Sequence, residues 1–278
     1  MRSRNLRIAA MLAAAAVCAS AQWVKHTTPG IPRTPEGKPN LSAPPPRASN
    51  GKPDLSGIWQ AEAAPIPDLI RLLPGGVNGL GEATPSKYFL NILADFKPDE
   101  APLQPAAAAA LRKLNPTPGG KDAPITRCLP AGIPLADVMP APFKIIQTPG
   151  LMAMLYEQDT FRQVFLDGRA QPEDPQPGWM GNSVGQWEGD TLVVHTQGFN
   201  DKSWLDVSGH THSEAMQLTE SFHRRDFGHM EAQITVDDPK TYTKPFIINF
   251  NLRLLPDTDL IEFSCTENEK DVSHLSGK

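Results

Sequence analysis

The sequence contains little cysteine and lacks an apolar run long enough to cross a membrane. Only three of its 278 residues are cysteine. The apolar run near the N-terminus, residues 8–17, has about ten residues, whereas a membrane-spanning helix needs roughly 20. We therefore expect no transmembrane segment in the mature protein.

Charge and motif content exclude several classes of function. The net charge is −5 and no basic cluster follows residue 21, so the chain lacks the electrostatic footprint of a nucleic-acid-binding protein. It also lacks a nucleophile elbow, a phosphate-cradling glycine loop, a dinucleotide-binding fingerprint and a metalloprotease motif. We expect no cofactor, no nucleic-acid partner, and a small molecule as the ligand or substrate.

The N-terminus is typical of a cleaved secretory signal peptide. Three arginines in residues 2–7 precede the apolar run, and Ala19-Ser20-Ala21 supplies the small residues that a signal peptidase needs. We expect residues 1–21 to be removed and the protein to be periplasmic or secreted. Acylation at Cys18 is the alternative, but Val17 is bulkier than the residue that usually precedes a lipoprotein cysteine.

Removal of residues 1–21 leaves two cysteines, Cys128 and Cys265, in a chain bound for an oxidising compartment. This setting favours a disulfide between them. The alternative is a reactive thiol. However, neither cysteine lies in a CxxC motif, and neither has a nearby histidine or helix N-terminus to activate it.

Twenty-nine prolines, about twice the usual frequency, are unevenly placed and mark the organisation of the chain. Residues 22–53 lack apolar periodicity and are predicted to be an extended or disordered lead-in. Residues 54–272 are predicted to be one β-barrel domain, with an irregular and helical insertion at residues 61–140. Its helices are expected over residues 86–96, capped by Ser86, and after Pro105. The insertion either packs against the barrel or covers its mouth as a lid.

After Cys128, short segments of alternating apolar and polar residues indicate strands. With residues 53–60 they make about ten strands, and nearly all are joined by short turns, which only antiparallel neighbours allow. The predicted fold is therefore mainly β, an antiparallel up-and-down barrel whose closure removes the exposed sheet edges, with a β-sandwich as the alternative. The predicted later strands are residues 143–147, 151–158, 160–166, 184–187, 191–197, 216–223, 229–236, 246–254 and 260–265.

Strand alternation places Glu220 on an otherwise apolar face. Desolvation there raises the pKa of a carboxyl group unless an arginine or several donors meet it, and a raised pKa suits a general acid. The alternative is a structural ion pair with Arg162 or Arg253. Tyr156 shares a face with apolar residues in the same way, so its hydroxyl is expected to point into the interior, for packing or for ligand contact.

The connection formed by residues 200–214 is long for a link between strands and is therefore a candidate for function. It contains Asp206, His210, His212 and Glu214. One interpretation is a metal site with His210 and His212 as ligands. A second is metal-free acid–base chemistry, with His212 as proton carrier and Asp206 or Glu214 as its partner. The third is a solvated loop without a catalytic role.

Aromatic residues around this connection suggest contact with a sugar or an aromatic ring. Trp179 precedes the predicted strand 184–187, and Trp204 lies within the connection itself. Stacking on a ligand and packing in the core are both open for each of them. Trp179, Trp204, Tyr156 and Arg162 form the predicted substrate-binding set.

Several segments resemble a family of uncharacterised exported proteins of soil and environmental bacteria. The resemblance covers roughly residues 50–272 and rests on FRQVFLDGR, WMGNSVGQWEGDTLVVHTQGFN, HSEAMQLTESFHRRDFGH and DDPKTYTKPF. It implies export and a shared β fold, but it brings no activity and no catalytic residue. Gly57-Ile58-Trp59 is in addition similar to the first strand of lipocalin-like barrels, in which the tryptophan plugs the closed end.

Two functions follow from these observations. The first is an exported barrel enzyme that acts on a small organic molecule or sugar derivative by metal-independent acid–base chemistry, of the lyase, hydratase or isomerase type. Its catalytic residues are predicted to be His212, Asp206, Glu214 and Glu220. The second is a lipocalin-like protein that binds or transports a small ligand without catalysis. A scaffold in the cell envelope is a third class, expected to show an exposed apolar patch and no cavity.

Overall fold

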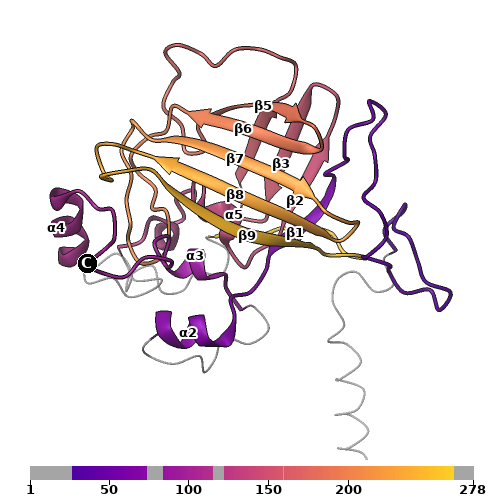
Figure 1. Ribbon diagram of the computed structural model, residues 1–278, viewed down its shortest axis with the longest axis horizontal. Coiled ribbons are helices and arrows are strands. Elements are labelled where there is room, and N and C mark those ends of the chain that lie inside the picture. Colours follow the sequence, from indigo (N-terminus) through magenta and orange to yellow (C-terminus); the bar gives the residue numbers. More distant parts are fainter. Residues whose placement is uncertain (1–26, 74–83, 115–121, 159, 266–278) are drawn as a thin grey trace, which may run out of the picture.

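Alternating apolar and polar residues build a closed barrel of nine strands (Figure 1). The computed structural model describes residues 27–73, 84–114, 122–158 and 160–265, so the predicted signal peptide and Cys18 lie outside the described residues. Each strand pairs with the next along the chain, and the last pairs with the first. The strands are β1 (Gly57–Ala61), β2 (Phe143–Gln147), β3 (Leu151–Tyr156), β4 (Thr160–Phe165), β5 (Asn182–Glu188), β6 (Thr191–Gln197), β7 (Gln217–Arg224), β8 (His229–Asp237) and β9 (Phe246–Leu254).

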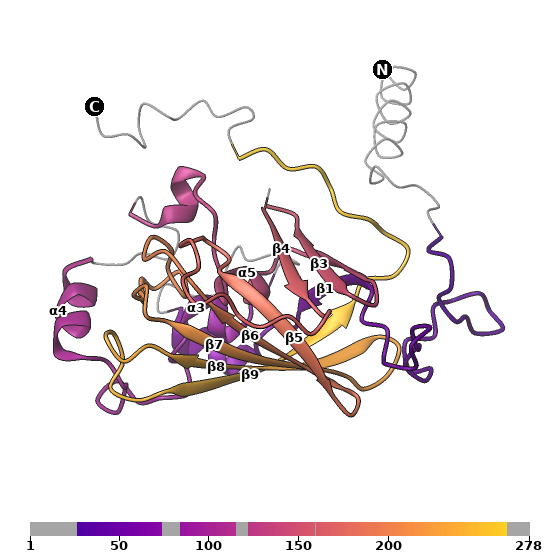
Figure 2. The same ribbon diagram turned by 90° about the horizontal axis from the view of Figure 1, so that it is seen from above.

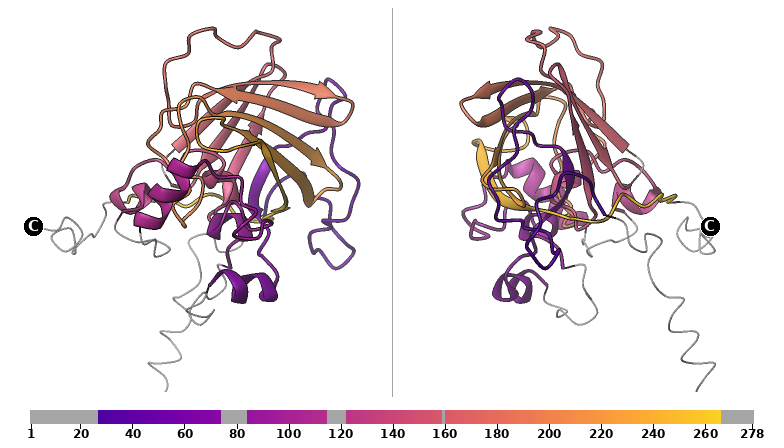
Figure 3. Two further views of the ribbon diagram at one scale, coloured as in Figure 1. Left: turned by 60° about the vertical axis from the view of Figure 1, so that its left-hand side comes forward. Right: turned by 90° about the vertical axis from the view of Figure 1, so that its right-hand side faces the viewer.

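One strand pair departs from the antiparallel pattern that the sequence predicts. β4 and β5 run parallel and share two registered pairs, Val164 with Ser183 and Phe165 with Val184. The connection 166–181 projects from the barrel (Figures 1 and 3) and returns the chain to the end of β4, so that β5 continues in the direction of β4. A short turn cannot make such a link. The sheet is therefore a mixed closed barrel, neither purely up-and-down nor the alternative β-sandwich.

The last predicted strand, residues 260–265, is not a strand. β1 pairs with β9 and occupies the edge that this segment would need. The segment instead runs along the outside of the barrel. It is held there because Lys144 Nζ lies 2.8 Å from Asp259 Oδ1, and the amide of Ile261 donates to Glu157 Oε1 at 3.0 Å.

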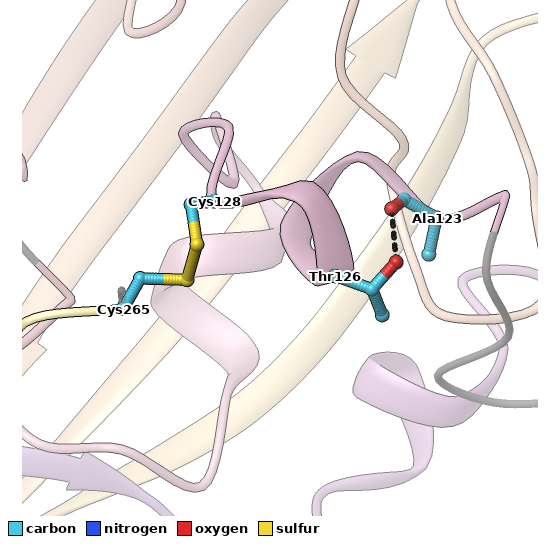
Figure 4. Close-up of a disulfide and its surroundings, with 4 residues drawn as sticks. All are labelled: Ala123, Thr126, Cys128 and Cys265. Carbon is cyan, nitrogen blue, oxygen red and sulfur yellow. Dashed lines mark hydrogen bonds between the residues drawn. A yellow bond between two sulfur atoms is a disulfide. The ribbon is translucent and has the colours of Figure 1, made fainter. Parts of the chain in front are cut away.

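Cys128 and Cys265 form the predicted disulfide, with their Cα atoms 5.6 Å apart (Figure 4). Cys128 follows the 3-10 helix η2 (Pro124–Arg127), in which Thr126 Oγ1 donates to the carbonyl of Ala123 at 2.7 Å. The bridge ties the C-terminal segment to the insertion between β1 and β2 across 137 residues of sequence. In the chain-entropy account, closing a loop of this length stabilises the fold by roughly 4–5 kcal/mol.

The insertion between β1 and β2 is mostly irregular, as predicted. Ser86 caps the helix that starts at residue 87, but the predicted helix over residues 86–96 already ends at Leu90. The amide of Ile92 donates to Asp206 Oδ2 at 2.6 Å, so a side chain takes the place of a helical carbonyl. The helices are α2 (Ile66–Leu72), α3 (Lys87–Leu90), α4 (Pro105–Leu114) and α5 (Leu135–Val138).

Residues 131–139, which include α5, are all buried, and we call them the plug segment. α5 contacts α3 and β1. The hydroxyl of Ser86 donates to the carbonyl of Val138 at 2.9 Å and fixes the end of the segment. Of the two alternatives for the insertion, packing and a lid, this part therefore packs into the molecule.

Residues 27–53, predicted to be extended or disordered, form two similar turns against the other end of the barrel (Figures 1 and 2). We call them the clasp segment. The stretches PRTPEGKPNLS (32–42) and PRASNGKPDLS (46–56) repeat one pattern. In each, the arginine donates to the carbonyl of the glycine four residues later, at 3.0 and 3.1 Å. The same guanidinium pairs with an aspartate elsewhere in the chain, Arg33 with Asp257 and Arg47 with Asp190.

Inward-facing side chains fill the interior of the barrel. Trp59, Met152, Val194 and Ile234 come from four different strands and are each 0% exposed. A filled apolar interior makes any polar group inside it an exception that needs a partner.

Candidate functional site

Two charged side chains, Arg162 from β4 and Glu220 from β7, meet in the apolar interior. Both are at most 1% exposed. Arg162 Nη1 donates to Glu220 Oε1 at 2.9 Å, and Nη2 donates to Oε2, which makes the pair bidentate. Of the two interpretations of Glu220, the ion pair is confirmed, and its partner is Arg162 and not Arg253.

Arg162, on β4, also connects its own strand to β5 and β6 through side-chain hydrogen bonds. Its Nε donates to Ser183 Oγ on β5 at 3.0 Å, and its Nη2 donates to Thr196 Oγ1 on β6 at 2.8 Å. Because β4 and β5 share only two registered pairs, these side-chain bonds reinforce the barrel wall where backbone pairing is shortest. The position of Arg162 is thus accounted for by the fold itself.

Asp137 reaches the same cluster from the plug segment. Its Oδ1 accepts a hydrogen bond from the hydroxyl of Tyr156 at 2.6 Å. Its Oδ2 lies 4.0 Å from Arg162 Nη1 and has no hydrogen-bond partner among the described residues. Burial, together with the charge of Glu220, raises the pKa of Asp137 to about 7, although Arg162 and the Tyr156 hydroxyl act in the opposite direction. Burial also raises the pKa of Tyr156.

A carboxyl group that titrates near pH 7 has the property that general acid–base catalysis requires. Here, however, Asp137, Tyr156, Arg162 and Glu220 are all buried. In this arrangement all four side chains are shielded from solvent. The cluster therefore contains a carboxyl group whose pKa suits proton transfer, but its side chains are buried away from solvent.

The histidine-containing connection packs inward around Asp206, which is fully buried. Asp206 Oδ2 lies 2.5 Å from His210 Nδ1 and accepts from the amide of Ile92. Its Oδ1 accepts from the amide of Ser208 at 2.9 Å. These contacts give Asp206 a structural role, because they join the connection to the end of α3.

His212 is buried beside Ser203. Its Nε2 lies 2.8 Å from Ser203 Oγ, and its Nδ1 lies 3.2 Å from the carbonyl oxygen of Ser213. Burial lowers the pKa of His212, so the imidazole is neutral at pH 7. The spacing of hydroxyl and imidazole is that of a nucleophile and its base. The plug segment covers this contact so closely that a Cβ added at Gly132 would lie 2.5 Å from Ser203 Oγ.

The structure does not bring the predicted catalytic residues together. Glu214 is exposed, His212 bonds to Ser203 and Ser213, and Glu220 is engaged inside the barrel. His210 and His212 contact different partners. Within the described ranges of the chain, no three histidine, cysteine or acidic side chains converge as a metal site would require.

The predicted substrate-binding set is divided in the same way. Tyr156 and Arg162 belong to the interior cluster. Trp179 packs, half-buried, against the main core, and Trp204 is half-buried and forms a bridge with Thr211. The four side chains thus do not line one common site.

A hollow of about 560 Å³ lies between the barrel and the clasp segment. Binding sites for small molecules have volumes of roughly 300–1,000 Å³. The exposed surface of this hollow is mostly apolar, and its charged lining residues are Lys144, Arg224, Asp54 and Asp259. Its apolar lining includes Ile31, Ile58, Phe227, Leu254 and Leu255.

Arg224, at the end of β7, is the buried cation of this hollow, with 3% exposure. Its Nε donates to the carbonyl of Phe227 at 3.2 Å, and its Nη1 donates to the carbonyls of Asp54 and Ser56. Its Cζ lies 4.9 Å from the ring centroid of Trp59. Arg224 is not among the site residues predicted from the sequence, although strand alternation places it on the same inward face as Glu220.

A second hollow of about 480 Å³ lies on the outside of β6–β9. Polar side chains such as His223, Glu231, Gln233 and Asn251 surround it, and neither arginine nor lysine is among its described lining residues. The first hollow combines an apolar wall with a few converging polar groups, as small-molecule sites do. We therefore take the hollow at the clasp segment as the candidate site.

No protein-family model, no curated protein and no solved structure matches this chain. Among the described residues, no helix has the length and apolar character needed to cross a membrane. The fold and the site define a closed β-barrel protein with a hollow at one end.

Proposed function

We propose that this protein binds a small, largely apolar molecule in the hollow beside the clasp segment and acts as a binding or transport protein. The observation that supports the proposal is the hollow itself, about 560 Å³ with mostly apolar walls and a buried cation. The disulfide is compatible with an extracellular or periplasmic protein, which is where the sequence predicts this one to act.

Binding is favoured over catalysis because the carboxyl group suited to proton transfer, Asp137, does not line the hollow that is open to ligands. The hollow is open to ligands, and its charged side chains hold existing contacts: Lys144 pairs with Asp259, and four of the five N–H groups of Arg224 bond to backbone carbonyls. Asp137, the carboxyl group with a pKa suited to proton transfer, lies instead within the buried plug segment.

A neutral fluorescent probe tests the proposal without presupposing a charge on the ligand. N-phenyl-1-naphthylamine is expected to bind the wild-type protein with increased emission, because burial removes its apolar surface from water. Ile31→Trp places a larger side chain in the lining of the hollow and is expected to abolish the signal. Ile247→Trp is the matched control, because Ile247 is exposed on β9. Binding that survives in Ile31→Trp, or is absent from the wild type, contradicts the proposal.

Acid–base catalysis stays a prediction, and one observation favours it as a second candidate. Asp137 has a pKa of about 7, and its Oδ2, beside Tyr156 and Arg162, has no hydrogen-bond partner within the described residues. A screen of lyase, hydratase and isomerase substrates with wild type and Asp137→Asn tests it. Turnover that falls by about 10²-fold or more in the variant is expected if Asp137 is the acid or base.

A further inference from the structure

We propose that the ligand of the hollow carries a carboxylate or a similarly compact anionic group, and that Arg224 recognises it. This inference rests on the proposed binding function and names the chemical class of the ligand. The apolar lining receives the body of the molecule, and the guanidinium receives its charged end.

Among the described residues, no carboxylate contacts the guanidinium of Arg224. Its hydrogen-bond acceptors in that part of the chain are the neutral carbonyl oxygens of Asp54, Ser56 and Phe227. A guanidinium has five N–H groups. Four of them make these bonds, because the carbonyl of Phe227 accepts from both Nε and Nη2, so one N–H has no partner among the described residues and is left for a ligand.

The nearest carboxylates are held away from the guanidinium by other partners. Asp54 Oδ1 accepts from the amide of Ser56 at 2.8 Å. Asp226 Oδ1 accepts from the amide of Gly228 at 3.0 Å and lies 2.6 Å from His229 Nδ1. Burial lowers the pKa of Arg224 to about 10, and these two charges offset only part of that effect. A bound anion would offset more of it.

Two aromatic rings hold the guanidinium in place before any ligand arrives. Its Cζ lies 4.9 Å from the ring centroids of Trp59 and Phe227. Its bonds to carbonyls from two separate segments fix its orientation further. Because the group is already ordered, a ligand does not lose affinity by having to order it.

Lys144 supplies a second positive charge to the same lining. Its ammonium pairs with Asp259, and both side chains are about one-third exposed. An anion close to this pair competes with Asp259 for the ammonium. The buried guanidinium therefore provides the stronger recognition, since charge-assisted bonds gain strength away from water.

Three ligands with one skeleton separate this inference from the proposed function. 4-Phenylbutyrate, 4-phenylbutan-1-ol and 4-phenylbutylamine are titrated into the wild-type protein by calorimetry at pH 7. The acid is expected to bind about 10-fold or more tightly than the alcohol, because a hydrogen bond to a charged group is worth more than one between neutral groups. The amine is expected to bind most weakly.

The outcomes distinguish the two claims. Equal binding of acid and alcohol, or tighter binding of the amine, overturns the anion inference and leaves the binding function standing. Failure of all three ligands, together with failure of the neutral probe, overturns the binding function. Loss of acid binding in Ile31→Trp confirms that the hollow is the site.

Variants assign the anion preference to Arg224. Arg224→Lys is expected to reduce the advantage of the acid over the alcohol to less than about 3-fold, since the three N–H groups of an ammonium cannot keep the four carbonyl bonds and also reach a ligand. Lys240→Met, at an exposed position away from the hollow, is the control and should retain the full advantage. If Arg224→Lys does not fold, the comparison of acid with alcohol in the wild type still decides the inference.

Discussion

Replacing Asp137 by asparagine should make the fold more stable at alkaline pH relative to the wild type. The buried carboxyl has a pKa of about 7, compared with 3.8 for an unperturbed aspartate. Between these values the folded protein binds more protons than the unfolded chain, so the free energy of unfolding falls as the pH rises. The contribution of this group is fully present below about pH 4 and is lost as the pH passes 7.

The size of the effect follows from the shift. A rise of about three pKa units, at 1.36 kcal/mol per unit, corresponds to about 4 kcal/mol. An asparagine side chain would keep the shape of the aspartate without a titrating group. The free energy of unfolding of Asp137→Asn, minus that of the wild type, should therefore increase by up to about 4 kcal/mol from pH 4 to pH 8. Burial has the largest effect on this value, followed by the charges of Glu220 and Arg162 and the hydrogen bond from the neutral Tyr156 hydroxyl.

Urea titrations measure the free energy of unfolding of Asp137→Asn and of the wild type. They are run at several pH values between about 4 and 8.5, with the disulfide intact. Asp237→Asn is the matched control, because Asp237 is an exposed carboxylate on β8. Its difference from the wild type should change little with pH. The reasoning is refuted if the Asp137→Asn difference is the same at both ends of the pH range, or if it changes in the opposite direction.

Three further outcomes are expected. Glu220→Gln should lower the free energy of unfolding by about 3–5 kcal/mol in urea titrations, because it removes the bidentate partner of the buried Arg162 guanidinium and leaves only Asp137 Oδ2 nearby, at 4.0 Å; a change under about 1 kcal/mol would contradict this. Cys128→Ser should cost about 2–5 kcal/mol by the same assay, and reducing agent should then have no further effect. Asp206→Ala should speed hydrogen exchange at the Ile92 amide, whose acceptor it removes, and unchanged exchange would show that the bond is unimportant.

Side-chain alternation predicted the parts of the fold that depend on which face a residue occupies. It placed Tyr156 and Glu220 inside, and both are there. An ion pair of Glu220 with Arg162 or Arg253 was the alternative prediction for this residue, and the partner is Arg162. The cysteine count predicted the disulfide for an independent reason, since a pair of cysteines in an exported chain favours a bridge.

Alternation carries no information about which strands are neighbours or in which direction they run. The parallel pairing of β4 with β5 was missed for that reason, although the length of the connection 166–181 was a signal against a hairpin. Residues 260–263, three of which are apolar, were predicted to be part of a strand. The sequence of one segment does not show whether a neighbouring strand has a free edge to pair with it. The edge they would need belongs to β1.

The candidate site was harder to predict because it depends on irregular segments. Asp137 lies in a stretch without periodicity, so nothing local indicates that it enters the barrel. The histidines of the 200–214 connection have a spacing that suggests a metal or acid–base site. In the structure they are buried, because Asp206 and the plug segment pack against them. A repeat search would have found the clasp segment, whose P-R-x-x-x-G-K-P pattern occurs twice.

The pairing of the first strand with the last has a consequence for how the chain is made. Trp59 of β1 is registered with Leu254 of β9, so this contact spans most of the sequence. A ribosome delivers β1 early, but its partner on that edge emerges only after every other strand. Until then β1 and β8 each present an unpaired edge, the kind of surface that promotes aggregation. Chains truncated before residue 246 should therefore collect in insoluble material.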